Sequence, residues 1–371
     1  MESLHLSFQR VVDAGMFKGV QLNSSLNLSH MFFADDTIFV GQWCDNNINI
    51  LTLVLDCFYR ASGLKINTSK SKIMGIHVAD YKVNGAAAKF GCLMLNTPFS
   101  YLGMKVGGSM SRTHAWEEVI DKVSSRLSRW KMKTLSLGGR LTLLKSVLGS
   151  MPIFHMSIFK APLAVLRKLE SIRSHFFNGH DQASRKATWI KRDSFLAPKD
   201  KGGLGVSSLY SLNRAIMLKW VWRFYCQSSS LWTRVMNAIH GEDGKIGKDL
   251  KACNQSCWLN IVNEITVLKL QGINFFDFMR LKLGNGINIS FWNDDWIGGD
   301  TLKNLYPRIY ALENYKHVTV HMKLADQTLA ASLRRKPRGG IEDAQFTELL
   351  DLMQTVTLTP ISDRWIWTLE V

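Results

Sequence analysis

The sequence contains 371 residues, of which 46% are hydrophobic and 20% are charged, ordinary values for a globular protein. No uninterrupted apolar run reaches the roughly 18 residues that a membrane helix needs, so we expect no membrane partner. The 46 Lys and Arg residues exceed the 30 Asp and Glu residues, which gives a net charge of +16 and indicates a polyanionic partner, first of all nucleic acid.

The positive charge is concentrated in one segment. Residues 1–104 carry 8 Lys and Arg against 7 Asp and Glu, whereas residues 105–200 carry 18 against 7. The length predicts two or three domains. The six cysteines are scattered, and the N-terminus lacks the basic start and apolar core of a signal peptide, so we expect reduced thiols and an intracellular protein.

Residues 30–40 predict a tight β-hairpin with buried arms and an acidic tip. Two apolar runs flank the adjacent carboxylates Asp35 and Asp36. Neighbouring carboxylates repel each other, and apolar arms would desolvate them, so a divalent cation would stabilise the pair. This pattern fits a two-metal phosphoryl or nucleotidyl transfer site. The alternative is an ordinary turn, where Asp is favoured for its local hydrogen bonds.

Helices are predicted on both sides of this hairpin. Apolar residues recur at helical spacing in residues 1–16 and again in residues 48–61. Residues 63–76 then predict a strand, a polar turn with Lys70 and Lys72, and a second strand. A lysine on such a turn could hold a phosphate or protonate a leaving pyrophosphate, and a solvated loop lysine is the alternative.

Three motifs in chain order resemble one family. They are Phe-Ala-Asp-Asp at residues 33–36, Ala-Ser-Gly-Leu-Lys-Ile-Asn at 61–67 and Phe-Ser-Tyr-Leu-Gly at 99–103. This order resembles the carboxyl-terminal part of the palm of reverse transcriptases from plant LINE-type (non-LTR) retrotransposons. Lys-Gly-Gly-Leu-Gly at 201–205 and Phe-Trp-Asn-Asp-Asp-Trp at 291–296 are similar to the region after that palm. The resemblance therefore covers most of the chain.

The resemblance implies roles for single residues. Asp35 and Asp36 match the paired catalytic aspartates that bind Mg²⁺. Lys70 is the best match to the lysine of the following loop, and Lys65 is the second candidate. The primer-grip turn matches Tyr101, Leu102 and Gly103. The implied activity is RNA-directed DNA polymerase activity, by two-metal nucleotidyl transfer with an RNA template and a DNA primer as partners. Apart from the resemblance, the basic stretch at residues 334–340 is a candidate nuclear-import signal, with a plain solvated linker as the alternative, so the expected location is the nucleus.

Two departures limit this implied activity. The family's third metal-binding aspartate and its nucleotide pocket precede the acidic hairpin, and only Asp13 is present there, without a matching motif. We therefore expect the chain to begin inside the palm and to end before the family's Cys/His zinc-binding segment. Such a chain is either a fragment of an enzyme, inactive alone, or a non-catalytic nucleic-acid-binding remnant.

Residues 113–199 predict a basic helical bundle similar to a polymerase thumb. Apolar residues at steps of three and four define one helix face from Trp116 to Trp130, and residues 139–148 and 163–177 continue the pattern. We expect tryptophans in the core and basic side chains on nucleic-acid phosphates, with a solvated basic face as the alternative. The predicted phosphate contacts are Lys122, Arg126, Arg129, Lys131, Lys133, Arg140 and Lys145.

Two motifs in the last third of the chain concern local structure. Asn285-Gly286 between alternating runs predicts a β-hairpin. Asp294-Asp295 is a rival acidic pair, but its aromatic neighbours favour a structural turn.

A zinc site is also conceivable from ligand types alone. Cys253-x3-Cys257 and His317-x3-His321 offer four ligands, but whole predicted elements separate the two pairs, which disfavours a closed zinc finger.

The sequence as a whole predicts an α+β chain in three parts. Residues 1–108 form the carboxyl-terminal part of a palm, residues 109–245 a basic helical thumb and connection region, and residues 246–371 a small mixed region with a β-hairpin. Mg²⁺ is the expected cofactor of the complete enzyme. No motif indicates an oligomeric state.

Overall fold

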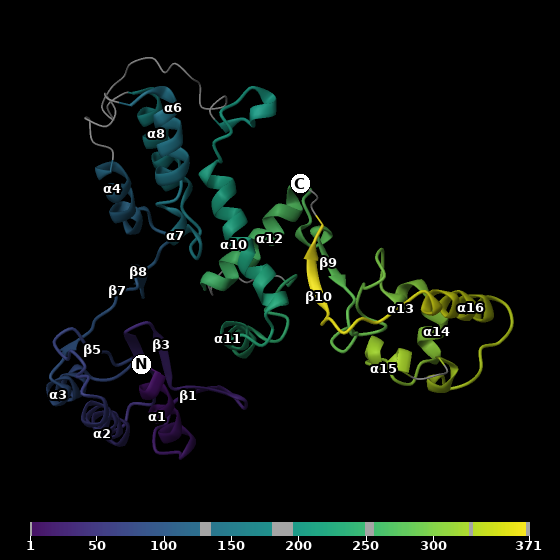
Figure 1. Ribbon diagram of the computed structural model, residues 1–371, viewed down its shortest axis with the longest axis horizontal. Coiled ribbons are helices and arrows are strands. Elements are labelled where there is room, and N and C mark those ends of the chain that lie inside the picture. Colours follow the sequence, from purple (N-terminus) through teal and green to yellow (C-terminus); the bar gives the residue numbers. More distant parts are fainter. Residues whose placement is uncertain (1, 127–134, 180–195, 249–255, 326–328, 369–371) are drawn as a thin grey trace. The chain divides into compact units, whose positions relative to one another are not determined.

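The computed structural model describes residues 2–126, 135–179, 196–248, 256–325 and 329–368. These residues form helices and short two-stranded sheets, which confirms the α+β class. The chain divides into two compact units, one of Met1–Trp220 with Ser229–Val262 and one of Val221–Ser228 with Asn263–Val371. The three-part division of the sequence stays a prediction. Figure 1 gives the order of the elements.

The first unit contains most of the strands. Its elements are α1 (Glu2–Asp13), β1 (Val20–Asn23), β2 (Leu26–Leu28), β3 (His30–Phe33), β4 (Asp36–Phe39), α2 (Asp45–Ser62), β5 (Lys72–Ile73), α3 (Asp80–Phe90), β6 (Leu93–Met94), β7 (Phe99–Tyr101), β8 (Met104–Val106), α4 (Glu117–Ser125), α6 (Leu137–Leu143), α7 (Ile153–Met156), α8 (Leu163–Asn178) and α11 (Leu231–His240). Helices α10 (Leu209–Cys226) and α12 (Cys257–Leu270) continue into the second unit. β1–β2, β3–β4 and β7–β8 pair antiparallel, and β5–β6 pair parallel.

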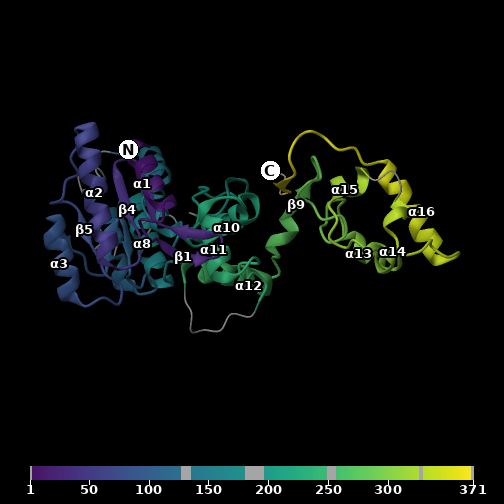
Figure 2. The same ribbon diagram turned by 90° about the horizontal axis from the view of Figure 1, so that it is seen from below.

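The β3–β4 hairpin rests on two helices. Leu4 and Phe8 of α1 are fully buried and belong to one cluster with Val54 and Phe58 of α2. The inward side chains of the hairpin, Phe32 and Phe39, pack against this cluster. Figures 1 and 2 both place α1 and α2 beside the hairpin. The helical periodicity of residues 1–16 and 48–61 therefore identified both helices, and Gly63, with φ 72°, ends α2 as the left-handed cap.

A second cluster fills a helical bundle formed by residues 110–126, 135–179 and 196–212. Trp116 is fully buried, and its indole N–H donates to Met110 O at 2.8 Å. It packs with α4, α8 and a π-helical turn at Leu144–Leu148. The expected helix from residue 113 begins as a 3-10 turn at Thr113–Trp116 and continues as α4, and Trp130 lies outside the described residues.

Buried polar side chains join the bundle to α10. The Asn213 side chain donates to Met156 O at 2.7 Å and to Phe159 O at 3.0 Å, and accepts from Ala161 N at 3.0 Å. These bonds satisfy backbone groups of α7 and of the connection between α7 and α8. The Gly-rich run at 199–205 forms a 3-10 turn at Lys199–Lys201 before α10.

The second unit has its own core. Its elements are β9 (Met279–Lys282), α13 (Leu302–Leu305), α14 (Pro307–Leu312), α15 (Val320–Ala325), α16 (Ile341–Gln354) and β10 (Arg364–Trp367). Phe291 and Trp292 are fully buried in its hydrophobic cluster. The indole N–H of Trp292 donates to Glu313 Oε2 at 3.2 Å, and the same carboxylate forms a buried ion pair with Lys323.

The predicted hairpin at Asn285-Gly286 is wrong. β9 pairs antiparallel with β10, with Arg280 opposite Ile366. The carboxylate of Asp363 accepts hydrogen bonds from three backbone amides, Gly284 N at 2.8 Å, Gly286 N at 2.9 Å and Asn288 N at 3.0 Å. These amides are thus bonded to a distant side chain, and β9 pairs with β10 rather than with the residues after Gly286.

Candidate metal and nucleic-acid site

The acidic hairpin has a two-residue turn. Phe33 pairs with Asp36, which leaves Ala34 and Asp35 as the connection between β3 and β4. Ala34 has φ 51°, a left-handed conformation that an L residue with a Cβ adopts at a cost of about 1–2 kcal/mol. The strain therefore lies directly before Asp35, where it fixes the direction in which the chain presents the two carboxylates.

The apolar runs predicted buried arms for this hairpin. One face of the arms is instead exposed. Met31 and Phe33 are 41% and 61% exposed, whereas their neighbours on the other face pack on α1 and α2. Asp35 and Asp36 are exposed. A two-stranded hairpin with helices on one face leaves its other face open, so the apolar runs do not desolvate the carboxylates.

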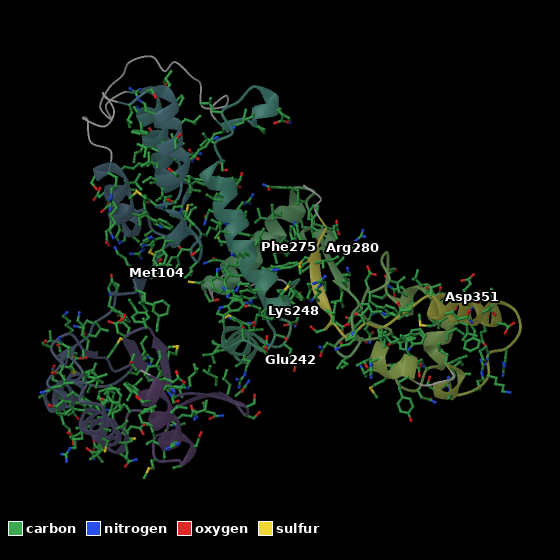
Figure 3. The ribbon with its side chains drawn as sticks, viewed as in Figure 1. Met104, Glu242, Lys248, Phe275, Arg280 and Asp351 are labelled. Carbon is green, nitrogen blue, oxygen red and sulfur yellow. The ribbon has the colours of Figure 1, made fainter. Side chains whose placement is uncertain are left out.

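A two-residue turn at residues 101–104 connects β7 to β8. Tyr101 pairs with Met104, which is labelled in Figure 3, and the two central residues have φ 49° (Leu102) and φ 78° (Gly103). Two positive φ angles are typical of a type I′ turn, the turn that matches the twist of a hairpin. Burial, and next the negative charge of Asp36, raise the pKa of Tyr101. The structure therefore brings the phenol of one motif near a carboxylate of the other.

Lys70 lies in an exposed turn after α2. Its backbone N–H donates to Asn67 O and Oδ1, both at 3.2 Å. Among the described residues, no ion pair joins its side chain to either aspartate. The expected strand at residues 63–67 is wrong, because that segment is irregular, and Lys72 lies in β5 rather than in the turn.

The donor chemistry of the acidic tip fits Mg²⁺ in part. Carboxylate oxygens are its preferred protein ligands, and the ion often binds one or two carboxylates together with water and substrate phosphates. No group of three or more His, Cys, Asp or Glu residues within the described ranges could hold a metal ion. Asp35 and Asp36 therefore supply two carboxylates without a third. Of the zinc candidates, Cys253 lies outside the described residues.

Charged side chains continue from the β7–β8 hairpin to α4. Lys105 Nζ lies 3.7 Å from Glu118 Oε2, and Lys122 Nζ lies 2.7 Å from Glu118 Oε1. Burial, and next the positive charge of Lys122, lower the pKa of the His155 imidazole on α7. Lys122 thus has a local counter-charge, which weakens its predicted role as a phosphate contact.

Arg140 has a structural partner as well. Its guanidinium donates to Phe177 O at 3.4 Å and occupies the space beside Gly179, where a Cβ atom would lie 2.4 Å from Nη1. Gly179 is the left-handed cap of α8, with φ 70°. A cation at a helix C-terminus stabilises the last carbonyls. This placement makes Arg140 a cap of α8.

Lys145 is an exposed cation on the π-helical turn. Its Nζ lies 3.7 Å from where a Cβ on Gly205 would be, and Lys199 Cγ lies 3.1 Å from the same point. The two lysines are far apart in sequence, so their proximity could not be read from the chain. Arg126 is exposed after α4. The predicted contacts Arg129, Lys131 and Lys133 lie outside the described residues.

The second acidic pair, Asp294 and Asp295, forms hydrogen bonds within local turns. Asp294 Oδ2 accepts from Ser290 N at 2.7 Å, and Asp295 Oδ1 accepts from Gly298 N at 2.9 Å. Both carboxylates thus close local turns, as the aromatic setting of residues 291–296 predicted. Within the described residues, no helix is both long and apolar enough to cross a membrane.

Comparison with known proteins finds two relatives, both from Arabidopsis thaliana. Over 191 residues, 51% of the chain, the sequence is 35% identical to a protein that bears the name ribonuclease H protein. Over 154 residues, 41% of the chain, it is 25% identical to a mitochondrial protein described as uncharacterized. The matched region covers 30% of the first relative and 96% of the second. No family model matches the chain.

Proposed function

We propose that this chain is part of an RNA-directed DNA polymerase of a plant LINE-type retrotransposon and acts in the nucleus. The observation that carries the proposal is the electrostatic effect of Asp36 on Tyr101. These residues belong to two separate motifs of the family resemblance, and a polymerase would need both at one primer terminus. The name of the longer relative, ribonuclease H protein, supports nucleic acid as the class of partner.

In this proposal each group of the site has a separate task. Asp35 and Asp36 would hold Mg²⁺, which when bound neutralises phosphate charge and orients the reacting oxygens. The strained turn at Ala34 fixes the two carboxylates relative to the hairpin. Residues 101–103 would support the primer strand, and Lys70 would protonate the leaving pyrophosphate from its exposed turn. Two carboxylates alone cannot fix both ions of a two-metal site, so a further carboxylate must come from outside the described residues.

Primer extension tests this proposal. The chain alone should not extend a DNA primer on an RNA template with Mg²⁺, and a fusion that supplies an upstream palm segment from a related element should do so. In the fusion, Asp35→Asn should abolish incorporation, and Lys70→Ala should lower the rate while primer affinity stays unchanged. The double variant Asp294→Asn/Asp295→Asn is the matched control and should keep full activity. If the folded control loses activity while Asp35→Asn retains it, then Asp35 and Asp36 are not the catalytic pair.

A second candidate function is nucleic-acid binding without catalysis. The observation in its favour is that the described residues hold no third carboxylate near Asp35 and Asp36. A fusion that binds primer and template but never incorporates a nucleotide would favour this remnant over the enzyme.

A further inference from the structure

Phe154 of α7 is an exposed aromatic residue of the helical bundle. The neighbouring Trp116 is fully buried and hydrogen-bonded, whereas Phe154 of α7 is 50% exposed. The expectation that tryptophans lie in the core thus holds for Trp116, and the ring at the surface is a phenylalanine. Single exposed apolar side chains are common, so exposure alone does not assign a role.

The position of the Phe154 ring provides a second observation. Cε1 of this ring lies 3.5 Å from where a Cβ on Gly103 would be, at the turn of the β7–β8 hairpin. His155 meets the ring edge to face, with centroids 5.4 Å apart. The ring is therefore supported from one side by a glycine and an imidazole while half of its surface stays in solvent.

The charge around this ring completes the argument. Lys105 of the β7–β8 hairpin and Lys122 of α4 both pair with Glu118, which leaves one excess positive charge in this group. The ring also belongs to residues 105–200, where 18 Lys and Arg face 7 Asp and Glu. A half-exposed ring in a basic setting is complementary to a polyanion that carries stacking bases, and less so to an apolar protein surface.

We propose that Phe154 is a stacking platform for one base of a bound single strand, beside the turn at Leu102 and Gly103. The inference rests on the proposed binding of nucleic acid and adds a contact with the base to the phosphate contacts of the lysines. Stacking of one base on an aromatic side chain contributes about 1–3 kcal/mol, which corresponds to roughly 5- to 150-fold in affinity. Because every base has a flat face, the contact should not depend on base identity.

The test compares two strands that carry the same charge. The whole chain is titrated with a fluorescent oligothymidylate and with an abasic strand of equal length at one salt concentration. The wild type should bind the thymidylate strand roughly 5- to 150-fold more tightly. Phe154→Ala should reduce that ratio toward one without changing the affinity for the abasic strand, and Phe154→Trp should retain or increase the ratio.

Tyr210 provides the matched control. It is 40% exposed on α10 and stacks with Arg214, whose guanidinium carbon lies 4.6 Å from the ring centroid. Tyr210→Ala should leave the ratio unchanged. Equal binding of both strands by the wild type, or a ratio unchanged in a folded Phe154→Ala variant, overturns the stacking contact but leaves phosphate binding intact. Failure to bind either strand overturns this inference together with the proposed function.

Discussion

The imidazole rings of His5 and His30 form a hydrogen bond, with Nδ1 and Nε2 2.8 Å apart, that joins α1 to the first residue of β3. Ser29 Oγ lies 2.8 Å from the other ring nitrogen of His30. Only one proton can lie between the two rings, so one nitrogen donates and the other accepts. Burial, and next the charge of His5, lower the pKa of His30, because the folded state favours the neutral ring.

This pair predicts a loss of stability in mild acid. A histidine whose folded pKa is depressed stabilises the fold above its unfolded pKa of 6.5, and that contribution is lost as the pH falls through the folded pKa. Unfolding of the first unit should therefore become easier below about pH 6.5. His155 and His240 also have lowered pKa values and add slopes of the same sign.

Chemical denaturation between pH 5 and 8 measures this effect. His30→Gln should flatten the pH dependence relative to the wild type, because His155 and His240 remain in both proteins. A slope that is unchanged in the variant would show that the His5–His30 pair does not contribute.

Ala34→Gly should stabilise the first unit. Glycine adopts φ 51° without a steric penalty, so the substitution removes strain of about 1 kcal/mol, partly offset by the entropy of the unfolded chain. The matched control is Ala61→Gly in α2, an exposed helical position, where we expect a loss of about 1 kcal/mol. Thermal or urea unfolding of the two variants should give changes of opposite sign. Equal destabilisation by both would mean that the turn is not strained.

Lys145→Ala and Arg140→Ala should separate phosphate binding from helix capping. Lys145 is exposed near Lys199, so its loss should weaken binding of any strand and reduce the magnitude of the log–log salt slope by about 1. Arg140 caps α8, so its loss should lower stability by about 1 kcal/mol and affect the slope less. Fluorescence anisotropy at several salt concentrations, with unfolding curves for both variants, measures the difference. A larger change of slope for Arg140→Ala than for Lys145→Ala would reverse these roles.

Asp363→Ala should destabilise the second unit. The substitution removes the acceptor of three backbone amides, and each amide left without a partner costs about 1 kcal/mol or more. Asp351→Ala on the exposed side of α16 (Figure 3) is the control and should change stability by less than about 0.5 kcal/mol. Hydrogen exchange of the Gly284 and Gly286 amides reports on the loop directly. Protection of these amides that survives Asp363→Ala would contradict the assignment.

Local patterns in the sequence predicted the elements that depend on local interactions. The helices of residues 2–13 and 45–62 follow from apolar periodicity, and the acidic hairpin follows from two apolar runs around Asp35 and Asp36. Asn285-Gly286 is the strongest short signal for a hairpin, yet it failed, because the Gly286 amide bonds to a carboxylate more than 70 residues away. Pairings at that distance leave no local signal.

Side-chain placement in the candidate site was less predictable than its motifs. Motif order placed Tyr101 and Asp36 in one site, but composition could not distinguish Arg140 as a helix cap from Lys145 as an exposed cation. The buried ion pair of Glu313 and Lys323 could not be predicted from the sequence either. Charged residues are normally exposed, and only the packed structure reveals that these two are buried together.

The partnership of β9 with β10 has a consequence for synthesis on the ribosome. β9 is translated roughly 80 residues before its partner strand, an interval of about 4–16 s at ordinary elongation rates. During that interval the nascent chain carries an unpaired strand edge beside the buried aromatic residues of this unit. We therefore expect co-translational folding of the second unit to be delayed until Trp367 has emerged. We also expect chaperones to bind the unpaired β9 segment during this delay.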